Sequence, residues 1–532
     1  MEKWQKKLLW VPLLILAAFP LAAAGGQAGG GGTASPSMGS GKITYPMDTP
    51  VTLTYWVELN ANVADKFVNL GDTPFARELE KRTGVKVEYL HPPAGGAVEQ
   101  FNLLIASGEL PDLMDRNWVN DYSGGPERAI ADGVILKLND LLPQYAPNFT
   151  EYLRANPRFD RMVKTDDRSY YAFPFLRGDD RLCLWQGLLV RKDWLDELGL
   201  SIPETFDEWH TVLTAFKEKK GSPAPLTFVS QNGAFIYGYK IDRDFYLGED
   251  GKVHWGSIEE AYRDYLTMMA RWYKEGLFDP DFATITSNQI TAKITGGVSG
   301  ATHAGLGGSL GTWTTSARTR DPKFAMTGAP VPVAKKGDKP VIQNIDNPYQ
   351  GQSTVITGSC KNVELAVRYL DWGYSQDGFW YYNYGTPGVS YNMVNNYPTL
   401  TPLILKNPDG LTAGQALASY TRANYNGPFV QDWAYYEQYL ILPEQHQAIA
   451  NWQLEEPYKY KLPPIQPNAS ESREYASIMS EVNTYRDEMA VKFILGTENL
   501  SSWTTYVNTL KRMRIDRAIA IQEAALARYN AR

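Results

Sequence analysis

Aromatic and polar side chains follow the ends of the predicted strands. Trp56 and Asn60 come after the first predicted strand, and Arg116 and Trp118 come just beyond the apolar pair 113–114. In an open parallel sheet, the ligand crevice lies outside the carboxyl ends of the strands. An indole packs its apolar face against a ligand while its N–H donates a hydrogen bond, and charged groups form stronger hydrogen bonds than neutral ones. These residues therefore predict a ligand crevice that offers apolar ring faces beside hydrogen-bonding groups.

The chain as a whole is rich in such side chains. Its 532 residues include 15 Trp, 33 Tyr and 19 Phe, and many of the Trp and Tyr residues fall in predicted loops. Position along the predicted elements selects nine candidate ligand contacts: Trp56, Asn60, Arg116, Trp118, Trp185, Trp313, Gln350, Tyr384 and Trp433. For each Trp, ordinary burial in the core is the competing interpretation.

A strand, a crossover helix and a second strand must position the first of these residues. Residues 84–90 alternate between apolar and polar, as a half-buried strand does, and apolar residues recur at helical spacing over 98–105 before Gly108. A second apolar strand follows at 113–114. This order predicts an α/β fold, and the chain of about 480 residues after the leader is too long for one ordinary core, so we expect two lobes with a cleft between them.

Later segments predict further elements by the same rules. Residues 188–190 form an apolar strand run, a helix after it ends at Gly199, and residues 203–205 open another helix. Helical spacing returns over 478–489, and a final helix follows Ile515. We expect these last helices to stabilise a lobe.

The first 24 residues predict a secretory signal peptide. Three lysines precede an apolar run over 8–19, and three alanines at 22–24 precede Gly25. A single transmembrane helix is the competing interpretation, but the apolar run is short for a bilayer span. Residues 25–46 are rich in Gly and Ser and predict a flexible tether. The protein is therefore expected to be exported.

Charge and cysteine content exclude several classes of protein. The formal net charge of −7 becomes −9 without the leader, which carries +2, and this acidic balance argues against a nucleic-acid partner. Cys183 and Cys360 are too few for a disulfide framework, and the sequence leaves open whether they pair. The five His residues show no HExxH spacing, and no CxxC occurs. We expect no metal site and no cofactor.

Two short motifs have alternative interpretations. Acidic residues over 242–250 suggest a calcium loop, but Tyr246 and Leu247 occupy positions where an EF-hand needs a ligand and then Gly, so Asp250-Gly251 is interpreted as a hairpin turn. Residues 307–311 formally match a nucleophile elbow, which needs a strand before the Ser and a helix after it. Glycines and polar turn formers precede that Ser, so a loop that allows close backbone approach is expected instead.

Several segments in the right order carry a resemblance to a known family. From Val51 to Asn530 the chain resembles the extracellular solute-binding proteins of bacterial ABC importers, in the carbohydrate-specific group of Gram-positive bacteria. The matching segments are VTLTYWVELN (51–60), FNLLIASGELPDL (101–113), LVRKDWLDELGLSIPETFDEW (189–209), RWYKEGLFDPDF (271–282), YNYGTPGVSYNMVNNYPTLT (382–401) and KFILGTENLSSWTTYVNTL (492–510).

The resemblance implies a class II, two-lobe α/β fold of the periplasmic-binding-protein type, with a ligand cleft between lobes joined by a multi-strand hinge. Lobe 1 would comprise residues 47–175 and 354–430, and lobe 2 residues 176–353 and 431–532. The chain would cross between the lobes near 173–177, 352–356 and 427–431. Such a protein captures a sugar, here favouring an oligosaccharide, and delivers it to membrane permease subunits. We expect a monomer.

One position departs from the family. Its lipoproteins carry a lipid-modified Cys after Leu-Ala-Ala, whereas Leu21-Ala22-Ala23 is followed here by Ala24, so the usual lipid anchor could not form. Two functional alternatives stay open. One is a glycoside hydrolase, which needs two carboxyl groups that flank the scissile bond, and the other is a sugar-sensing module for a membrane receptor. Arginines at 116, 177 and 422 would suit an acidic oligosaccharide, but arginines also bind neutral sugars.

Overall fold

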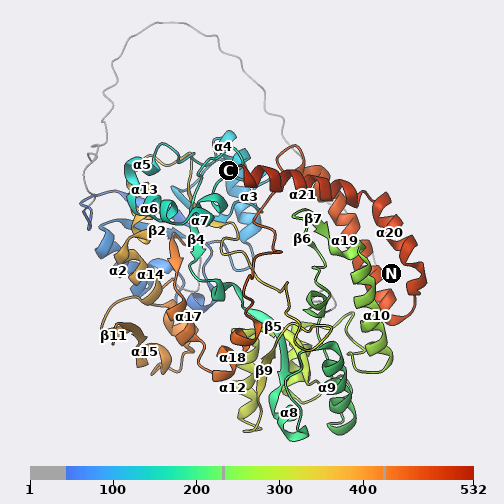
Figure 1. Ribbon diagram of the computed structural model, residues 1–532. Helices are drawn as coiled ribbons and strands as arrows, with labels where there is room; N and C mark the ends of the chain where they lie inside the picture. Colours follow the sequence, from blue (N-terminus) through green and yellow to red (C-terminus); the bar gives the residue numbers. More distant parts are fainter. Residues whose placement is uncertain (1–43, 230–233, 423–426) are drawn as a thin grey trace, which may run out of the picture. The chain divides into compact units, whose positions relative to one another are not determined.

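The computed structural model describes residues 44–229, 234–422 and 427–532 (Figure 1). The predicted signal peptide, and the predicted tether up to residue 43, lie outside the described residues. Within the described ranges, no helix is both long enough and apolar enough to span a bilayer.

A six-stranded sheet carries the predicted strand–helix–strand unit. Its strand order is β13-β4-β10-β3-β1-β2. The strands are β1 (Thr52–Trp56), β2 (Lys86–Leu90), β3 (Leu113–Asn117), β4 (Phe173–Arg177), β10 (Gln352–Ile356) and β13 (Phe429–Gln431). Strand β1 is parallel to both β2 and β3, as predicted, while β10 runs antiparallel to β3 and β4. The three predicted crossover segments thus form neighbouring strands, but the division into lobes stays a prediction.

Helix α3 (Ala97–Ser107) connects β2 to β3 and ends where the sequence predicts. Gly108 adopts a left-handed conformation with φ 73°, and its N–H donates to the carbonyl of Leu104. Glycine takes this conformation without steric cost, which ends the helix. The ring of Phe101 packs into the core formed with Trp56 and Trp118.

A second sheet is fully antiparallel, in the order β8-β5-β9. Its strands are β5 (Gln186–Arg191), β8 (Ala301–Gly305) and β9 (Met326–Ala329). Helix α18 (Pro443–Trp452) packs directly against this sheet because two glycines leave room: a Cβ at Gly187 would lie 2.4 Å from the ring of Trp452, and one at Gly328 would lie 2.6 Å from Ala448. A side chain at either position would push the helix away.

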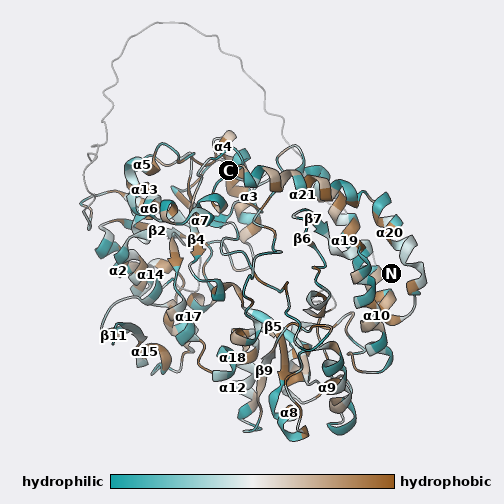
Figure 2. Ribbon diagram, viewed as in Figure 1, coloured by the Kyte–Doolittle hydropathy of each residue, from teal (hydrophilic) through white to brown (hydrophobic). Residues whose placement is uncertain are grey.

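The predicted helices around the second core are confirmed. Thr205 and Glu208 form a capping box at the start of α9 (Phe206–Lys219), and Gly199 ends α8 (Lys192–Leu198). Helices α10 (Glu260–Lys274), α19 (Ser472–Leu495), α20 (Trp503–Arg512) and α21 (Ile515–Asn530) contribute to one large apolar cluster with them. Both hydrophobic and hydrophilic residues occur along each of these helices (Figure 2), as expected for helices that bury one face.

Shorter elements complete the described chain. The remaining helices are α1 (Ala61–Ala64), α2 (Pro74–Thr83), α4 (Gly125–Ala131), α5 (Leu142–Tyr145), α6 (Pro147–Ala155), α7 (Pro157–Met162), α11 (Ser287–Thr295), α12 (Thr312–Arg318), α13 (Val363–Asp371), α14 (Gln376–Tyr384), α15 (Pro402–Leu405), α16 (Ala413–Ala418) and α17 (Trp433–Tyr439). Strands β6 (Phe245–Leu247) and β7 (Val253–Trp255) form the predicted hairpin, and β11 (Tyr391–Val394) pairs with β12 (Tyr397–Leu400). Cys183 and Cys360 are both buried and free.

The glycine-rich segment corrects one expectation. Residues 306–311 form a π-helical turn between β8 and α12, rather than a loop. The residues before the turn form a strand because Ala301 and Thr302 are fully buried within the antiparallel sheet, where they pair with β5. A strand does therefore precede Ser309 and a helix follows it, but a π-helical turn separates them in place of the sharp turn on which a nucleophilic Ser sits.

Candidate functional site

A pocket of about 220 Å³ lies at the carboxyl ends of β1 and β3, where the sequence predicts a crevice. We call it the strand-end pocket. It brings together the predicted contacts Asn60 and Arg116. Its lining residues are Val57, Glu58, Leu59, Asn60, Ala61, Val63, Leu70, Asp115, Arg116, Gln352 and Arg422. Charged and amide groups thus converge on one small hollow.

Asp115 organises the floor of this pocket. Its carboxylate accepts hydrogen bonds from Gln352 Nε2 at 2.8 Å, from Thr354 Oγ1 at 3.1 Å and from the hydroxyl of Tyr55 at 3.2 Å, and Arg422 Nη2 lies 3.9 Å away. Burial, and then the charge of Asp115, raise the pKa of Tyr55 well above its ordinary value, so the phenol stays protonated and can donate. Asp115 therefore acts as a fixed acceptor that orients the groups around it.

Arg116 stands between the strand-end pocket and a larger cavity. Its Nε lies 2.7 Å from a carboxylate oxygen of Asp121 and its Nη1 lies 3.4 Å from one of Glu58. Glu58 lines the strand-end pocket and Asp121 lines the larger cavity. Two carboxylates therefore hold a charged donor at the predicted crevice.

The larger cavity has a volume of about 940 Å³. It lies among residues 101–132, 162–171, 349–351 and 464–476, and it includes the predicted contact Gln350. The carbonyl of Gln350 accepts a hydrogen bond of 2.9 Å from Asn117 Nδ2, at the end of β3. The cavity and the strand-end pocket therefore both adjoin the same end of β3.

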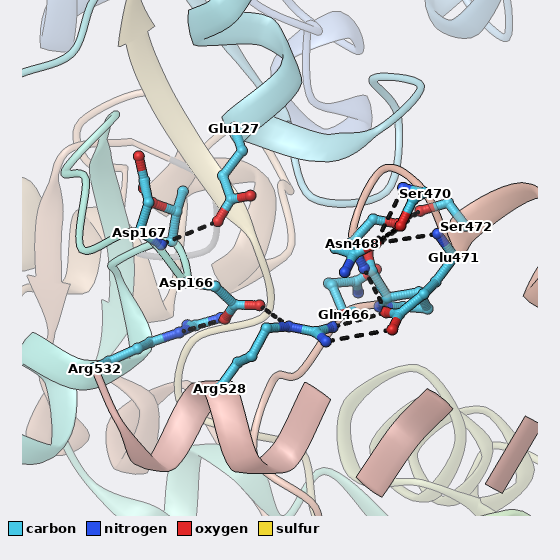
Figure 3. A network of polar contacts seen from close by, with 12 residues as sticks. Glu127, Asp166, Asp167, Gln466, Asn468, Ser470, Glu471, Ser472, Arg528 and Arg532 are labelled. Carbon is cyan, nitrogen blue, oxygen red and sulfur yellow. Dashed lines mark hydrogen bonds and ion pairs between the residues drawn. The ribbon is translucent and has the colours of Figure 1, made fainter. Parts of the chain in front are cut away.

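A network of ion pairs borders the larger cavity (Figure 3). Asp166 accepts from Arg528 Nε at 2.6 Å and pairs with Arg532 Nη2 at 2.7 Å, while Arg528 Nη2 also lies 2.9 Å from Glu471. These contacts join the end of α21 to the segment around residue 166, far away in the sequence.

A third polar group lies where β4 ends. The guanidinium of Arg177 and the indole N–H of Trp185 both reach the carboxylate of Asp346, at 3.0 Å and 2.8 Å. Trp185 is 42% exposed, whereas the other five predicted aromatic contacts are all at most 9% exposed. Its ring is therefore the one best placed to stack on a ligand in this conformation.

The other predicted aromatic contacts are packed inside the protein. Trp56 and Trp118 belong to the core around Phe101, and Trp313 donates to Thr291 Oγ1 at 3.1 Å. The hydroxyl of Tyr384 donates to Asp432, and the guanidinium of Arg181 lies 4.2 Å above the ring of Trp433. None of these five rings has an open face here, so ligand contact stays a prediction for each.

Four charged or amide residues of the strand-end pocket are absent from the nine predicted contacts: Glu58, Asp115, Gln352 and Arg422. Asp115 carries a local signal, because it directly follows the apolar pair 113–114 and precedes the predicted contact Arg116. Gln352 carries none, because only the pairing of β10 with β3 brings it to Asp115.

Comparison with known proteins identifies the family. The family model described as "Bacterial extracellular solute-binding protein" matches residues 58–378. The chain is 25% identical over 531 residues to the fructooligosaccharide ABC transporter substrate-binding protein FusA of Streptococcus pneumoniae, covering 92% of each chain. It is 26% identical over 223 residues to the polygalacturonan/rhamnogalacturonan-binding protein YtcQ of Bacillus subtilis, covering 40% of this chain and 43% of that protein.

Solved structures share the fold. The alginate-binding protein AlgQ2, in a crystal structure without calcium ion, superposes with a TM-score of 0.69 at 25% identity, covering 92% of this chain and 100% of AlgQ2. An EF-hand mutant of FusA from S. pneumoniae, in complex with fructo-nystose, gives 0.70 at 23% identity, covering 90% and 100%. The predicted α/β fold of class II solute-binding proteins is confirmed. The chain belongs to the bacterial extracellular solute-binding protein family.

Proposed function

We propose that this protein is exported, captures an oligosaccharide, and delivers it to the permease of an ABC importer. The observation that carries the proposal is the strand-end pocket, where Arg116, Gln352 and Asn60 converge at the carboxyl ends of parallel strands. Arginine and amide groups provide the donors and acceptors that sugar hydroxyls require.

The volumes of the two hollows support a ligand longer than one ring. Small-molecule sites usually measure about 300 to 1,000 Å³. The strand-end pocket, at about 220 Å³, is below that range and the adjoining cavity, at about 940 Å³, is near its upper end. A chain of sugar units could occupy both, with Arg116 between them. The similar proteins FusA and YtcQ are named for binding oligo- and polysaccharides, which agrees with this proposal.

The strand-end carboxylates favour binding over hydrolysis. A glycosidase needs one carboxyl group to deliver a proton and a second to act as base or nucleophile. Asp115 is 2% exposed and already accepts three hydrogen bonds, and Glu58 is mostly exposed and paired with Arg116. Each is therefore placed to hold a neighbour rather than to attack a glycosidic bond.

A thermal-shift screen with ligand analysis tests the proposal. The purified protein would be heated with neutral fructo- and galacto-oligosaccharides and with acidic galacturonate and alginate oligomers. Ligand at a hundred times its Kd stabilises the folded state by about 2.7 kcal/mol, so a hit should raise the Tm in a concentration-dependent way. Mass spectrometry should recover the glycan intact. No shift with any glycan would overturn sugar capture, and shortened products would favour the hydrolase alternative.

A further inference from the structure

A small cavity of about 20 Å³ lies beside the three-stranded sheet, and no residue of the strand-end pocket lines it. His303 from β8 and Gln343 from the segment before β10 line it, together with Tyr237, Asn344 and Trp452. A cavity of this size holds one water-sized group.

Two side chains of this cavity, His303 and Gln343, have polar atoms without a hydrogen-bond partner among the described residues. His303 is 6% exposed and Gln343 is 5% exposed. Within the described residues, both ring nitrogens of His303 and both amide atoms of Gln343 have no hydrogen-bond partner. Leaving one buried donor or acceptor unsatisfied costs about 1 to 3 kcal/mol, and native proteins satisfy the great majority of such atoms. Four unsatisfied atoms around one cavity therefore point to a group that binds there.

The chemistry of the cavity selects an uncharged group. Of the described residues that line it, none carries a formal charge at neutral pH. Burial lowers the pKa of His303 to about 4, so its imidazole is neutral, with one nitrogen donating and the other accepting. Gln343 likewise offers a carbonyl oxygen and an amide N–H. A hydroxyl group, which both donates and accepts, matches this set, whereas burying an unpaired carboxylate would be strongly unfavourable.

The walls of the cavity are fixed by packing. His303 pairs with Leu188 across β8 and β5, and Trp452 Nε1 donates to the carbonyl of Leu188 at 3.2 Å. The absence of a side chain at Gly187 lets the ring of Trp452 close against the sheet. The cavity is therefore a built feature of the fold rather than a loose gap.

The lining of the cavity includes residues that are close in sequence to Trp185 and Asp346. Two partly exposed residues form part of this lining: Gln186, which directly follows Trp185, and Asn344, which lies two residues before Asp346. Asp346 accepts the hydrogen bond from the Trp185 indole. A ring stacked on Trp185 could therefore direct one substituent towards His303 and Gln343.

We propose that this cavity is a specificity subsite that receives an uncharged hydroxyl group of the bound glycan while the sugar ring packs on Trp185. The inference rests on the proposed function and extends it, because it assigns a neutral sugar unit, rather than a uronic acid, to this position. Elsewhere Arg116 and Arg422 could still accept a charged unit.

The test compares isosteric variants. Gln343→Met removes the amide with little change in shape, and His303→Leu does the same for the imidazole. We expect each to raise the Kd for the glycan hit at least tenfold in calorimetry. The Tm of the unliganded variants should be unchanged or higher, because unsatisfied polar atoms have been removed. Gln445→Met is the control: Gln445 Nε2 donates to the carbonyl of Leu306 at 2.8 Å, so this variant should lose stability and keep its affinity.

Each outcome decides the inference. If the wild type binds a glycan and both variants bind it with affinity within twofold, the subsite is wrong and sugar capture stands. If the wild type binds no glycan, the proposed function and the subsite both fail. A ligand-bound crystal structure with only ordered water between His303 and Gln343 would also overturn the subsite. Should Gln343→Met fail to fold, His303→Leu still decides between these results.

Discussion

Trp185 offers the clearest separation of ligand binding from folding. Its residue is 42% exposed, and its indole N–H is bound to Asp346. A Trp side chain presents about 250 Å² in all, so about 100 Å² is open to solvent, and a ligand stacked on one face would cover about half of that. At about 25 cal/mol per Å², covering this area contributes about 1.3 kcal/mol, which is close to tenfold in Kd. We therefore expect Trp185→Ala to weaken glycan binding roughly tenfold.

The same substitution should destabilise the fold far less than removal of a fully buried Trp, because 42% of the residue already faces water. Trp118 is the matched control. It is fully buried, and its ring lies 5.3 Å from that of Phe101 and 6.1 Å from that of Tyr122. Replacing such a residue with Ala usually destabilises a protein by about 3 to 5 kcal/mol. Trp118→Ala should therefore lower the urea midpoint strongly.

Isothermal titration of the glycan hit, with urea unfolding of each variant, measures both effects. Trp185→Phe should retain most of the affinity, because a ring remains at the position. The reasoning would be refuted if Trp185→Ala bound the glycan as tightly as the wild type. It would also be refuted if Trp185→Ala were as unstable as Trp118→Ala, since the ring would then serve the core.

Three further predictions concern titration, ion pairs and thiols. Burial lowers the folded-state pKa of His303 to about 4 from an ordinary 6.5, so the unfolded chain takes up the proton first and stability is lost as the pH falls below about 6.5. Between pH 7 and pH 4.5, the free energy of unfolding of His303→Leu in urea should fall by about 2 kcal/mol less than that of the wild type. Equal falls would contradict a buried, neutral imidazole. Asp166→Asn removes the carboxylate that Arg528 and Arg532 share. Urea unfolding should show a free energy of unfolding lower by about 1 to 3 kcal/mol and a weaker dependence of stability on salt. A midpoint equal to that of the wild type would show that the network contributes nothing to stability. Burial raises the pKa of Cys360 to about 12 and raises that of Cys183 as well. Neither thiol of the native protein should therefore react with a disulfide reagent at pH 8 until urea is added. Rapid reaction of the native protein would contradict the burial of the thiols.

Much of the fold could be predicted from local sequence patterns. The alternation over 84–90 and the helical spacing over 98–105 correspond to β2 and α3, and Gly108 ends the helix by its left-handed backbone. At the start of α9, Thr205 caps the helix where residues 203–205 predict that it begins. These features depend on a few neighbouring residues, so a single sequence contains them.

Features that depend on distant pairing could not be predicted. A π-helical turn replaces the loop expected over 307–311. The strand before it exists because residues 301–305 pair with β5, more than a hundred positions earlier. In the strand-end pocket, Gln352 meets Asp115 across 237 positions through the register of β10 on β3.

Strand ends also do not reveal which side chains face a crevice. Arg116 and Trp118 are two positions apart, yet the first lines the strand-end pocket and the second is buried beside Phe101. The sequence places both just beyond the same apolar pair, and both lie near the ring of Phe101, so position along the chain does not separate a pocket residue from a core residue. A position-based choice therefore selects the right edge of the sheet without resolving its individual contacts.

A crystal structure of the protein with its tightest-binding glycan tests the central claim most directly. The account predicts an intact oligosaccharide whose hydroxyl groups contact Arg116 and Gln352 at the strand-end pocket, with one ring against Trp185. A glycan bound elsewhere on the protein, with Arg116 and Trp185 both free of contact, would contradict it.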